Sequence, residues 1–282
     1  MSEKHMIVPS ALSGIRLDRA LAELLPETGL RHRRRLCEEG RVTVNARRAK
    51  PSLKLMEGME VRVSEDSCEP ARPEDLGVYV LGAEDGFAAV YKPEGVHSAV
   101  IDGRTNCSVE AMLPALFPEY APVLLNRLDN PTSGILLVAL NAGAAQRYQH
   151  IEDRGGIRKE YLAEVSGSVV APVTIRRALD VADRRVVRVL DEDSSDPLRQ
   201  TAVEPIRHEA SSASTLVCCR IAKGARHQIR VHLASIGHPI LGDTLYAGPE
   251  AERLHLHHYR LEIGQAVFQA PCPFAEEDSA QP

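Results

Sequence analysis

Apolar and polar positions recur with a regular period in the first sixty or so residues of the chain. Apolar residues at helical spacing across 15–25 predict a helix. The basic stretch 31–39 predicts a second helix, which ends at Gly40. Alternating apolar and polar residues in 41–45 and in 59–63 then predict two strands joined by a loop. The pattern therefore predicts a small unit made of two helices and a hairpin.

A second and larger set of periodic segments begins after residue 77. The runs 78–83 and 87–92 are rich in β-forming residues and flank Asp85-Gly86, which predicts a hairpin. Further elements follow along the chain, namely strands at 134–140, 158–167 and 214–222 and helices at 142–155 and 227–237. Strands and helices that mix without a regular β-α-β alternation are typical of an α+β fold.

Two polar stretches suggest where these units begin and end. Residues 64–76 contain two prolines and no apolar period, which favours a linker. Residues 271–282 are mostly polar and acidic, which favours a flexible tail. We therefore expect a first domain at 1–63 and a second at 77–270.

Charge changes the interpretation of the first unit. The chain of 282 residues has a net charge of −5, which by itself argues against nucleic acid as a partner. Residues 1–63, however, hold thirteen basic and eight acidic residues, whereas the rest holds 21 basic and 31 acidic ones. The positive charge is therefore concentrated in the first unit. There is no apolar run of eighteen residues and no apolar leader, so we expect a cytoplasmic protein without a membrane partner.

Two charged residues in the second unit suggest chemistry. Asp129 stands in a polar turn directly before the apolar run 134–140. A lone aspartate there is usually solvated or caps the turn. Arg230, however, lies beside the apolar stripe of the predicted helix 227–237, and a buried arginine requires an anion. A single buried pair of Asp129 and Arg230 would keep the carboxylate ionised, as a nucleophile or a base requires.

The first unit resembles the S-four-like RNA-binding domain over most of residues 15–63. The similar stretches read RLDRALAELLP, EEGRVTVN and KPSLKLMEGMEVRV. The resemblance implies that the second helix and the following loop grip structured RNA through phosphate contacts. The residues so assigned are Arg31, Arg33, Arg34, Arg35, Arg47, Arg48 and Lys50. A solvated basic helix face without a ligand is the alternative interpretation.

The second unit resembles the RluA-type pseudouridine synthases over roughly residues 78–265. Four motifs carry the resemblance, in the order VYKPEGV, RLDNPTSGILLVALN, RKEYLAEVSG and HQIRVHLASIGHPILGDTLYAG. It implies a mixed, mainly antiparallel sheet and an isomerase that converts uridine to pseudouridine in RNA. It further implies that Asp129 is the catalytic aspartate, Tyr161 the active-site tyrosine and Arg230 the partner of the aspartate.

The same resemblance suggests substrate contacts and a reaction course. The expected substrate-binding residues are Asn126, Arg127, Arg226, His227 and Gln228. The carboxylate either attacks C1′ of the ribose or takes the 2′ proton, and the sequence leaves both routes open. No cofactor and no metal are expected, because atoms are exchanged within one nucleotide. The expected partner is structured RNA, ribosomal rather than transfer RNA, with no obligate protein partner.

Two other functions remain open at this stage. The chain has Asn126 where the family usually has histidine, and Ala225 where it usually has arginine. These differences favour a catalytically silent RNA-binding or ribosome-assembly factor on the same scaffold. A glycosidic hydrolase would need a second acid near Asp129 to activate water, and no motif supplies one. Asp243 is expected to serve in a turn or in structure rather than as that acid.

Overall fold

The computed structural model describes residues 2–38, 40–65, 71–100, 108–183, 185–211 and 213–275. These residues divide into two compact units, the first made of the described residues up to 71 together with Val100, and the second of the described residues in 72–99 and from 108 onward. The predicted linker 64–76 and the predicted tail 271–282 both fall partly outside the described residues. None of the helices within the described ranges has the length and apolar content needed to span a membrane.

The first unit packs two short helices against a four-stranded sheet of order β1-β4-β2-β3. Its elements are β1 (Ser2–Ile7), η1 (Ser10–Leu12), α1 (Leu17–Ala20), α2 (Leu30–Glu38), β2 (Val42–Val44), β3 (Arg47–Arg48) and β4 (Glu60–Glu65). Buried residues of α1 and α2 share one core with Val42, Val61 and Val63 of the sheet. The predicted helices and hairpin are therefore present, and β1 and β3 extend the hairpin on both sides.

The first predicted helix is shorter than its apolar period suggests. After Ala20 the backbone turns tighten, since Ala22 N donates to Arg19 O at 3.1 Å and Glu23 N to Ala20 O at 3.2 Å. Leu21 and Leu25 are nevertheless buried in the core. The apolar spacing thus marks the buried face correctly, although tertiary packing ends the regular helix early.

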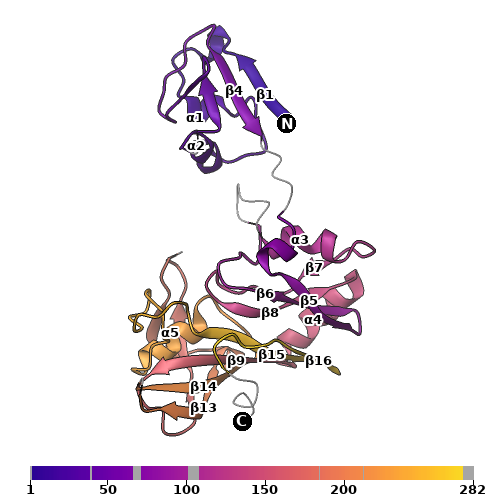
Figure 1. Cartoon of the computed structure of the whole chain (residues 1–282), viewed down its shortest axis with the longest axis vertical. Coiled ribbons are helices and arrows are strands. Elements are labelled where there is room, and N and C mark those ends of the chain that lie inside the picture. The colour runs from indigo at the N-terminus through magenta and orange to yellow at the C-terminus, as the bar shows by residue number, and fades with distance from the viewer. Residues whose placement is uncertain are drawn as a thin grey trace. The chain divides into compact units, whose positions relative to one another are not determined.

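The second unit is built on one large sheet, which holds ten strands among the described residues. Its main path runs β10-β13-β14-β9-β15-β8-β6-β5, with β16 beside β15 and β7 beside β8. Figure 1 shows β8, β9 and β15 near the middle of this unit. The strand bounds are β5 (Tyr79–Glu84), β6 (Phe87–Lys92), β7 (Val123–Leu124), β8 (Ser133–Ala139), β9 (Ile157–Ser166), β10 (Val173–Ile175), β13 (Thr201–Glu209), β14 (Ser214–Ile221), β15 (Leu256–Ile263) and β16 (Ala266–Gln269).

Helices and a separate hairpin complete the second unit. They are η2 (Glu74–Leu76), α3 (Val109–Leu116), α4 (Ala142–Asp153), η3 (Pro197–Arg199) and α5 (Gln228–Ser235), with the two-stranded hairpin β11 (Arg177–Asp180) and β12 (Arg188–Asp193). The start of α4 follows its sequence signal, because the Asn141 side chain accepts from Ala144 N at 2.9 Å. The mixed α+β fold with a mainly antiparallel sheet is confirmed.

Strand pairing in the large sheet changes from antiparallel to parallel at β8. Every side chain of β8 is buried, and β8 pairs antiparallel with β6 but parallel with β15. Gly134 makes the parallel pairing possible, since it has a φ of 117° and a Cβ there would lie 2.3 Å from His258 O. The loop before β8 carries Asp129, so this crowded pairing sets where the polar turn emerges.

Candidate active site

Asp129 lies in the loop between β7 and β8, and the backbone of that loop is held on both sides of the aspartate. The Ser98 hydroxyl donates to Leu128 O at 2.8 Å and accepts from Leu128 N at 2.9 Å. Gly95 N donates to Asn130 O at 2.9 Å, and Asn130 returns a bond to Gly95 O at 2.8 Å. The segment after β6 therefore fixes the backbone around Asp129, while the Asp129 side chain remains 23% exposed.

Lys92 anchors the same loop from inside the protein. Its side chain is fully buried, and Nζ donates to Pro93 O and Val96 O at 2.8 Å each and to Asn130 O at 3.1 Å. Burial lowers the pKa of Lys92 to about 7, although the charge of Asp129 acts in the opposite direction. Sequence reasoning gave Lys92 no role. Its place in the VYKPEGV motif was the available signal.

Arg230 is shared between two aspartates. Its Nη1 lies 3.2 Å from Asp129 Oδ2, whereas Nε and Nη2 each donate to one oxygen of Asp243 at 2.7 Å. The sequence predicted a single buried pair of Asp129 and Arg230, and that prediction is incomplete. A guanidinium has two edges. Asp243, which is completely buried, takes one edge and orients the other toward Asp129.

The environment keeps Arg230 charged. Its side chain is 7% exposed, and burial alone would lower its pKa. The hydrogen bonds and charge of Asp243, together with the charge of Asp129, outweigh burial and raise the pKa instead. A permanent cation thus lies 3.2 Å from the Asp129 carboxylate.

Tyr161, on β9, packs against a histidine of β15. Its ring stacks on the His258 ring of β15, with centroids 4.4 Å apart and planes 9° from parallel. Burial, and secondarily the charge of Asp129, raise the pKa of Tyr161. The hydroxyl therefore keeps its proton near neutral pH. Tyr161 fits a packing partner or a proton donor better than a phenolate base.

His258 is itself a fully buried residue with a defined proton position. Its Nδ1 lies 2.7 Å from Ile135 O, and since a carbonyl only accepts, Nδ1 carries the proton. Burial lowers the pKa of His258 to about 3. The ring beneath Tyr161 is therefore neutral, and sequence reasoning had not connected these two residues.

The predicted substrate-binding residues take different places. Arg127 is exposed, and His227 Nε2 lies 3.7 Å from Asp129 Oδ2. Asn126 Oδ1 accepts from Leu137 N at 2.7 Å, so its amide is engaged by β8. Arg226 Nη2 donates to Val181 O at 2.9 Å. The structure brings His227 to Asp129 and turns Asn126 and Arg226 toward the backbone.

Gln228 stands apart from the other predicted substrate-binding residues, because its side chain is 2% exposed. Its Oε1 accepts from Ala225 N at 2.9 Å, and its Nε2 donates to Arg199 O, Gln200 O and Thr201 Oγ1 at 3.2–3.3 Å. These bonds hold the turn that starts α5. The structure therefore uses Gln228 to build the helix start and does not bring it to the surface.

The predicted RNA-binding residues of the first unit lie on α2, on β3 and directly after β3. Arg48 packs over Gly40, where a Cβ would lie 2.7 Å from Arg48 Nε, so β3 and the end of α2 are neighbours. Arg34 is paired with the buried Asp18 at 2.7 Å, and Arg16 bonds the same carboxylate. The exposed members of the predicted set are Arg31, Arg34, Arg47, Arg48 and Lys50, while Arg33 and Arg35 are half-buried.

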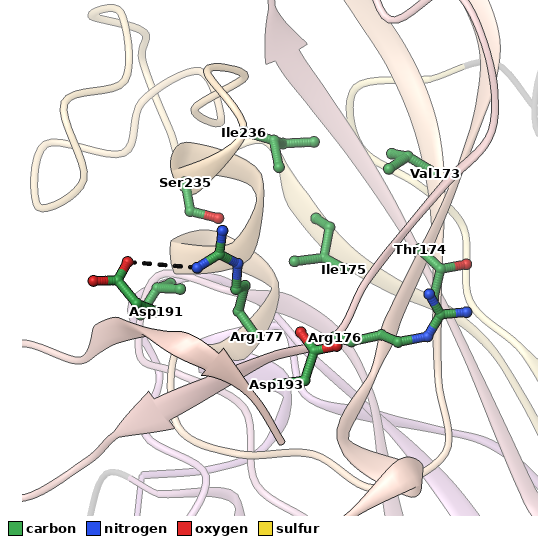
Figure 2. A pocket seen from close by; sticks show the side chains of 10 residues that line it. Val173, Thr174, Ile175, Arg176, Arg177, Asp191, Asp193, Ser235 and Ile236 are labelled. Carbon is green, nitrogen blue, oxygen red and sulfur yellow. Dashed lines mark hydrogen bonds and ion pairs between the residues drawn. The ribbon is translucent and has the colours of Figure 1, made fainter. Parts of the chain in front are cut away.

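A separate hollow of about 420 Å³ lies between β10, the β11–β12 hairpin and the end of α5. Figure 2 shows Arg177 pointing toward Asp191 at its edge, in an ion pair of 3.5 Å. None of the residues predicted to be catalytic lines it. In the described part of the chain, no three His, Cys, Asp or Glu side chains gather as a metal ion would require.

The site thus pairs a partly exposed carboxylate, in the loop before β8, with a buried arginine of α5 beside a mainly antiparallel sheet. The chain belongs to the RNA pseudouridylate synthases, since the family model of that description matches residues 86–235. A model of the S4 domain matches residues 15–61. The protein is therefore an isomerase of RNA with an N-terminal S4 domain, and the predicted family membership is confirmed.

Individual relatives agree with this assignment. The ribosomal large subunit pseudouridine synthase C of Escherichia coli is 32% identical over 89% of this chain and 82% of its own length. The ribosomal large subunit pseudouridine synthase D of Xanthomonas campestris is 30% identical over 88% and 76%. Among solved structures, human RNA pseudouridylate synthase domain containing 1 has a TM-score of 0.57 and 25% identity, over 70% of this chain and 84% of that one.

Proposed function

We propose that this protein converts uridines of large-subunit ribosomal RNA to pseudouridine, with Asp129 as the reacting carboxylate. The names of the relatives support this class of RNA, because both are ribosomal large subunit pseudouridine synthases. The first unit would hold the structured RNA through its exposed basic residues, and the second would act on one base. We therefore place ribosomal RNA ahead of transfer RNA as substrate.

The observation that carries the role of Asp129 is its contact with Arg230. The 3.2 Å contact joins a partly exposed carboxylate to a cation that Asp243 fixes from the other side. Isomerisation breaks the bond from C1′ to N1, rotates the base and joins C1′ to C5, with loss of the C5 proton. Whether the carboxylate attacks C1′ or takes the 2′ proton, it must be ionised and accessible. The partial exposure of Asp129 and its contact with a buried cation support this role.

The reaction also requires the base to leave its stack and enter a closed site. We propose that Tyr161, which stacks on the neutral His258 ring and whose pKa is raised in part by the charge of Asp129, packs against that base. Because its hydroxyl keeps its proton, we assign Tyr161 to packing and orientation of the base rather than to removal of the C5 proton as a phenolate. We further propose that Arg127, which is exposed two residues before Asp129, contacts the RNA backbone.

The test uses RNA labelled with tritium at C5 of uridine, because isomerisation releases that hydrogen to water. The full chain should release tritium from a large-subunit ribosomal RNA transcript and less or none from transfer RNA. Asp129→Asn should abolish release while RNA affinity stays within about twofold, because the change removes only a charge. Equal loss of binding would contradict the catalytic role.

Mapping of pseudouridine in cells would name the target. A strain whose only copy carries Asp129→Asn should lose modification at discrete uridines of ribosomal RNA. An unchanged map would favour the silent RNA-binding or assembly factor instead, and Asn126 and Ala225 would then be the residues to revert.

A further inference from the structure

The β11–β12 hairpin forms a two-stranded sheet of its own beside the large sheet. Its base is held by His232, whose Nε2 lies 3.0 Å from Arg177 O. Its tip is held at two points by residues close to Asp129 in space. Arg226 donates to Val181 O and also to Asp183 O, and Tyr246 OH accepts from Val187 N at 3.0 Å. The tip is therefore attached to the active site itself.

The Tyr246 contact continues toward the carboxylate. Tyr246 OH lies 2.8 Å from His227 Nδ1, and His227 Nε2 lies 3.7 Å from Asp129 Oδ2. The two rings meet edge to face at 5.7 Å, and the Arg230 guanidinium lies 5.3 Å from the centre of the Tyr246 ring. A continuous series of contacts thus runs from the hairpin backbone to Asp129.

The donors and acceptors of this series define the proton on His227. The amide of Val187 can only donate, so the Tyr246 oxygen accepts from it, and we assign the single hydroxyl proton to the 2.8 Å contact with His227 Nδ1. Nδ1 is then an acceptor, and Nε2 carries the proton of the neutral ring. That N–H faces the Asp129 carboxylate. Burial lowers the pKa of His227, even though the charge of Asp129 acts to raise it, so the ring is neutral at pH 7.

The backbone of His227 adds a second indication. It has a φ of 55° directly before α5, in the left-handed region that side chains other than glycine rarely adopt. Such strain persists only where the surroundings impose it, and it is common at functional sites. Here it aims one ring nitrogen at Tyr246 and the other at Asp129.

We propose that Tyr246 and His227 are positioning residues that couple the docking of the described hairpin-tip residues, 181–183 and 185–187, to the charge environment of Asp129. The tip carries the exposed Arg185, and the exposed Arg188 follows it. Arginine side chains bind phosphates, so substrate RNA is the partner that would hold the tip in its docked position. When the tip is seated, the Val187 amide fixes the hydroxyl and the imidazole N–H faces the carboxylate. This inference rests on the proposed function, because it requires Asp129 to be the reacting group.

The first test is Tyr246→Phe, which removes the hydroxyl and keeps the ring beside Arg230. We expect kcat to fall at least about tenfold while KM for RNA stays within about twofold, because only orientation at the reacting centre is lost. The matched control is Tyr79→Phe, which deletes a hydroxyl from the half-exposed Tyr79 of β5 and should leave kcat unchanged. A wild-type kcat for Tyr246→Phe would overturn the proposal.

A pair of substitutions at His227 separates the ring from the backbone. Glutamine can place an N–H near the position of Nε2, whereas asparagine can reach only toward the position of Nδ1. Asparagine, however, tolerates a positive φ better than glutamine does. We therefore expect His227→Gln to retain several-fold more kcat than His227→Asn. The reverse order would show that only the backbone conformation matters and would overturn the proposal.

Nitrogen NMR of the histidine rings gives a readout that needs no RNA. The His227 signals, identified by their loss in His227→Gln, should show an unprotonated Nδ1 and a protonated Nε2 at pH 7 in the full chain. Tyr246→Phe should abolish this preference. A protonated Nδ1 in the unaltered protein would overturn the inference whether or not the enzyme acts on ribosomal RNA, whereas failure of tritium release alone would concern only the proposed function.

Discussion

At the scale of single residues, Arg230 shows how one buried cation can serve two anions. Asp243 accepts from Nε and Nη2 with a fully buried carboxylate, while Asp129 accepts from Nη1 and stays partly open to water. Two aspartates therefore have different roles, and the difference in their burial sets those roles. Asp243 holds the guanidinium in place, and Asp129 is free to meet a substrate.

This division predicts different costs for two matched substitutions. Asp243→Asn leaves a buried arginine short of an anion and should lower the free energy of unfolding by about 3 kcal/mol. Asp129→Asn removes a partly exposed charge and should cost less than about 1 kcal/mol. Urea unfolding of both variants measures the difference. Equal midpoints would mean that Asp243 does not anchor Arg230.

The buried histidines of β15 predict a dependence of stability on pH. Burial lowers the pKa of His258 to about 3 and that of His257 to about 4, whereas both titrate near 6.5 when unfolded. The unfolded chain therefore binds more protons below pH 6.5. The contribution of these two histidines to stability should be present above pH 6.5 and should be lost as the pH drops from 6.5 through 4 to about 3.

His258→Phe tests the contribution of one ring to that slope. The substitution keeps an aromatic ring against Tyr161 but removes the titrating group. The change of unfolding free energy between pH 6.5 and 4.5 should become shallower by up to about 1.4 kcal/mol per pH unit. The exposed His150→Gln serves as control. Parallel curves for His258→Phe and the unaltered protein would exclude His258 as a source of the slope.

At the scale of elements, the parallel pairing of β8 with β15 places the Asp129 loop next to the strand that packs against Tyr161. β15 carries His258 under Tyr161, and β8 follows directly from the Asp129 loop. The pairing requires Gly134, because β15 passes through the space that a Cβ would fill. One small residue therefore brings two strands, and with them two parts of the site, into register.

Gly134→Ala should destabilise the protein more than a positive φ alone would. We expect a loss of at least about 2 kcal/mol in unfolding free energy, since strain at a positive φ adds to overlap with backbone atoms. Gly237→Ala is the control, because Gly237 has a φ of 84° but nothing within 4 Å of a Cβ, and it should cost about 1 kcal/mol. Equal losses of unfolding free energy in the two variants would show that overlap with β15 does not destabilise Gly134→Ala.

At the scale of the whole molecule, charge and chemistry belong to different units. The first unit is basic and carries its exposed arginines around α2 and β3, whereas the second unit is acidic overall and carries Asp129. Non-specific affinity for RNA should therefore come mainly from the first unit, and turnover from the second. The two parameters can be changed separately.

Replacement of Arg31, Arg47, Arg48 and Lys50 by glutamine should test this separation. RNA affinity should fall, and the slope of log affinity against log salt should decrease by about 0.7 to 0.9 for each phosphate that the protein no longer neutralises. Turnover at saturating RNA should stay near the unaltered value. Lys4→Gln, on β1, is the control for removal of a positive charge in the same unit. An unchanged salt slope in the fourfold variant would exclude these residues from the RNA-binding face.

Local patterns in the sequence determined much of this protein. Periodicity predicted the strands at β6, β8, β9 and β14 and the helices at α4 and α5, because buried faces repeat with the period of the element. The motifs around Asp129 and Arg230 predicted the family, which the comparisons confirm. Secondary structure and sequence motifs depend on residues that are close together in the sequence. Both can therefore be recognised before the fold is known.

Only the tertiary structure decided which side chains share a partner. Asp243 lies 114 positions from Asp129, yet both bind one guanidinium, and Lys92 reaches the carbonyl of Asn130 from another strand. The left-handed His227 and its contact with Tyr246 likewise depend on where α5 begins against the hairpin. Such contacts depend on how strands and loops pack across the sheet. A local pattern in the sequence cannot predict them, because the partners are far apart along the chain.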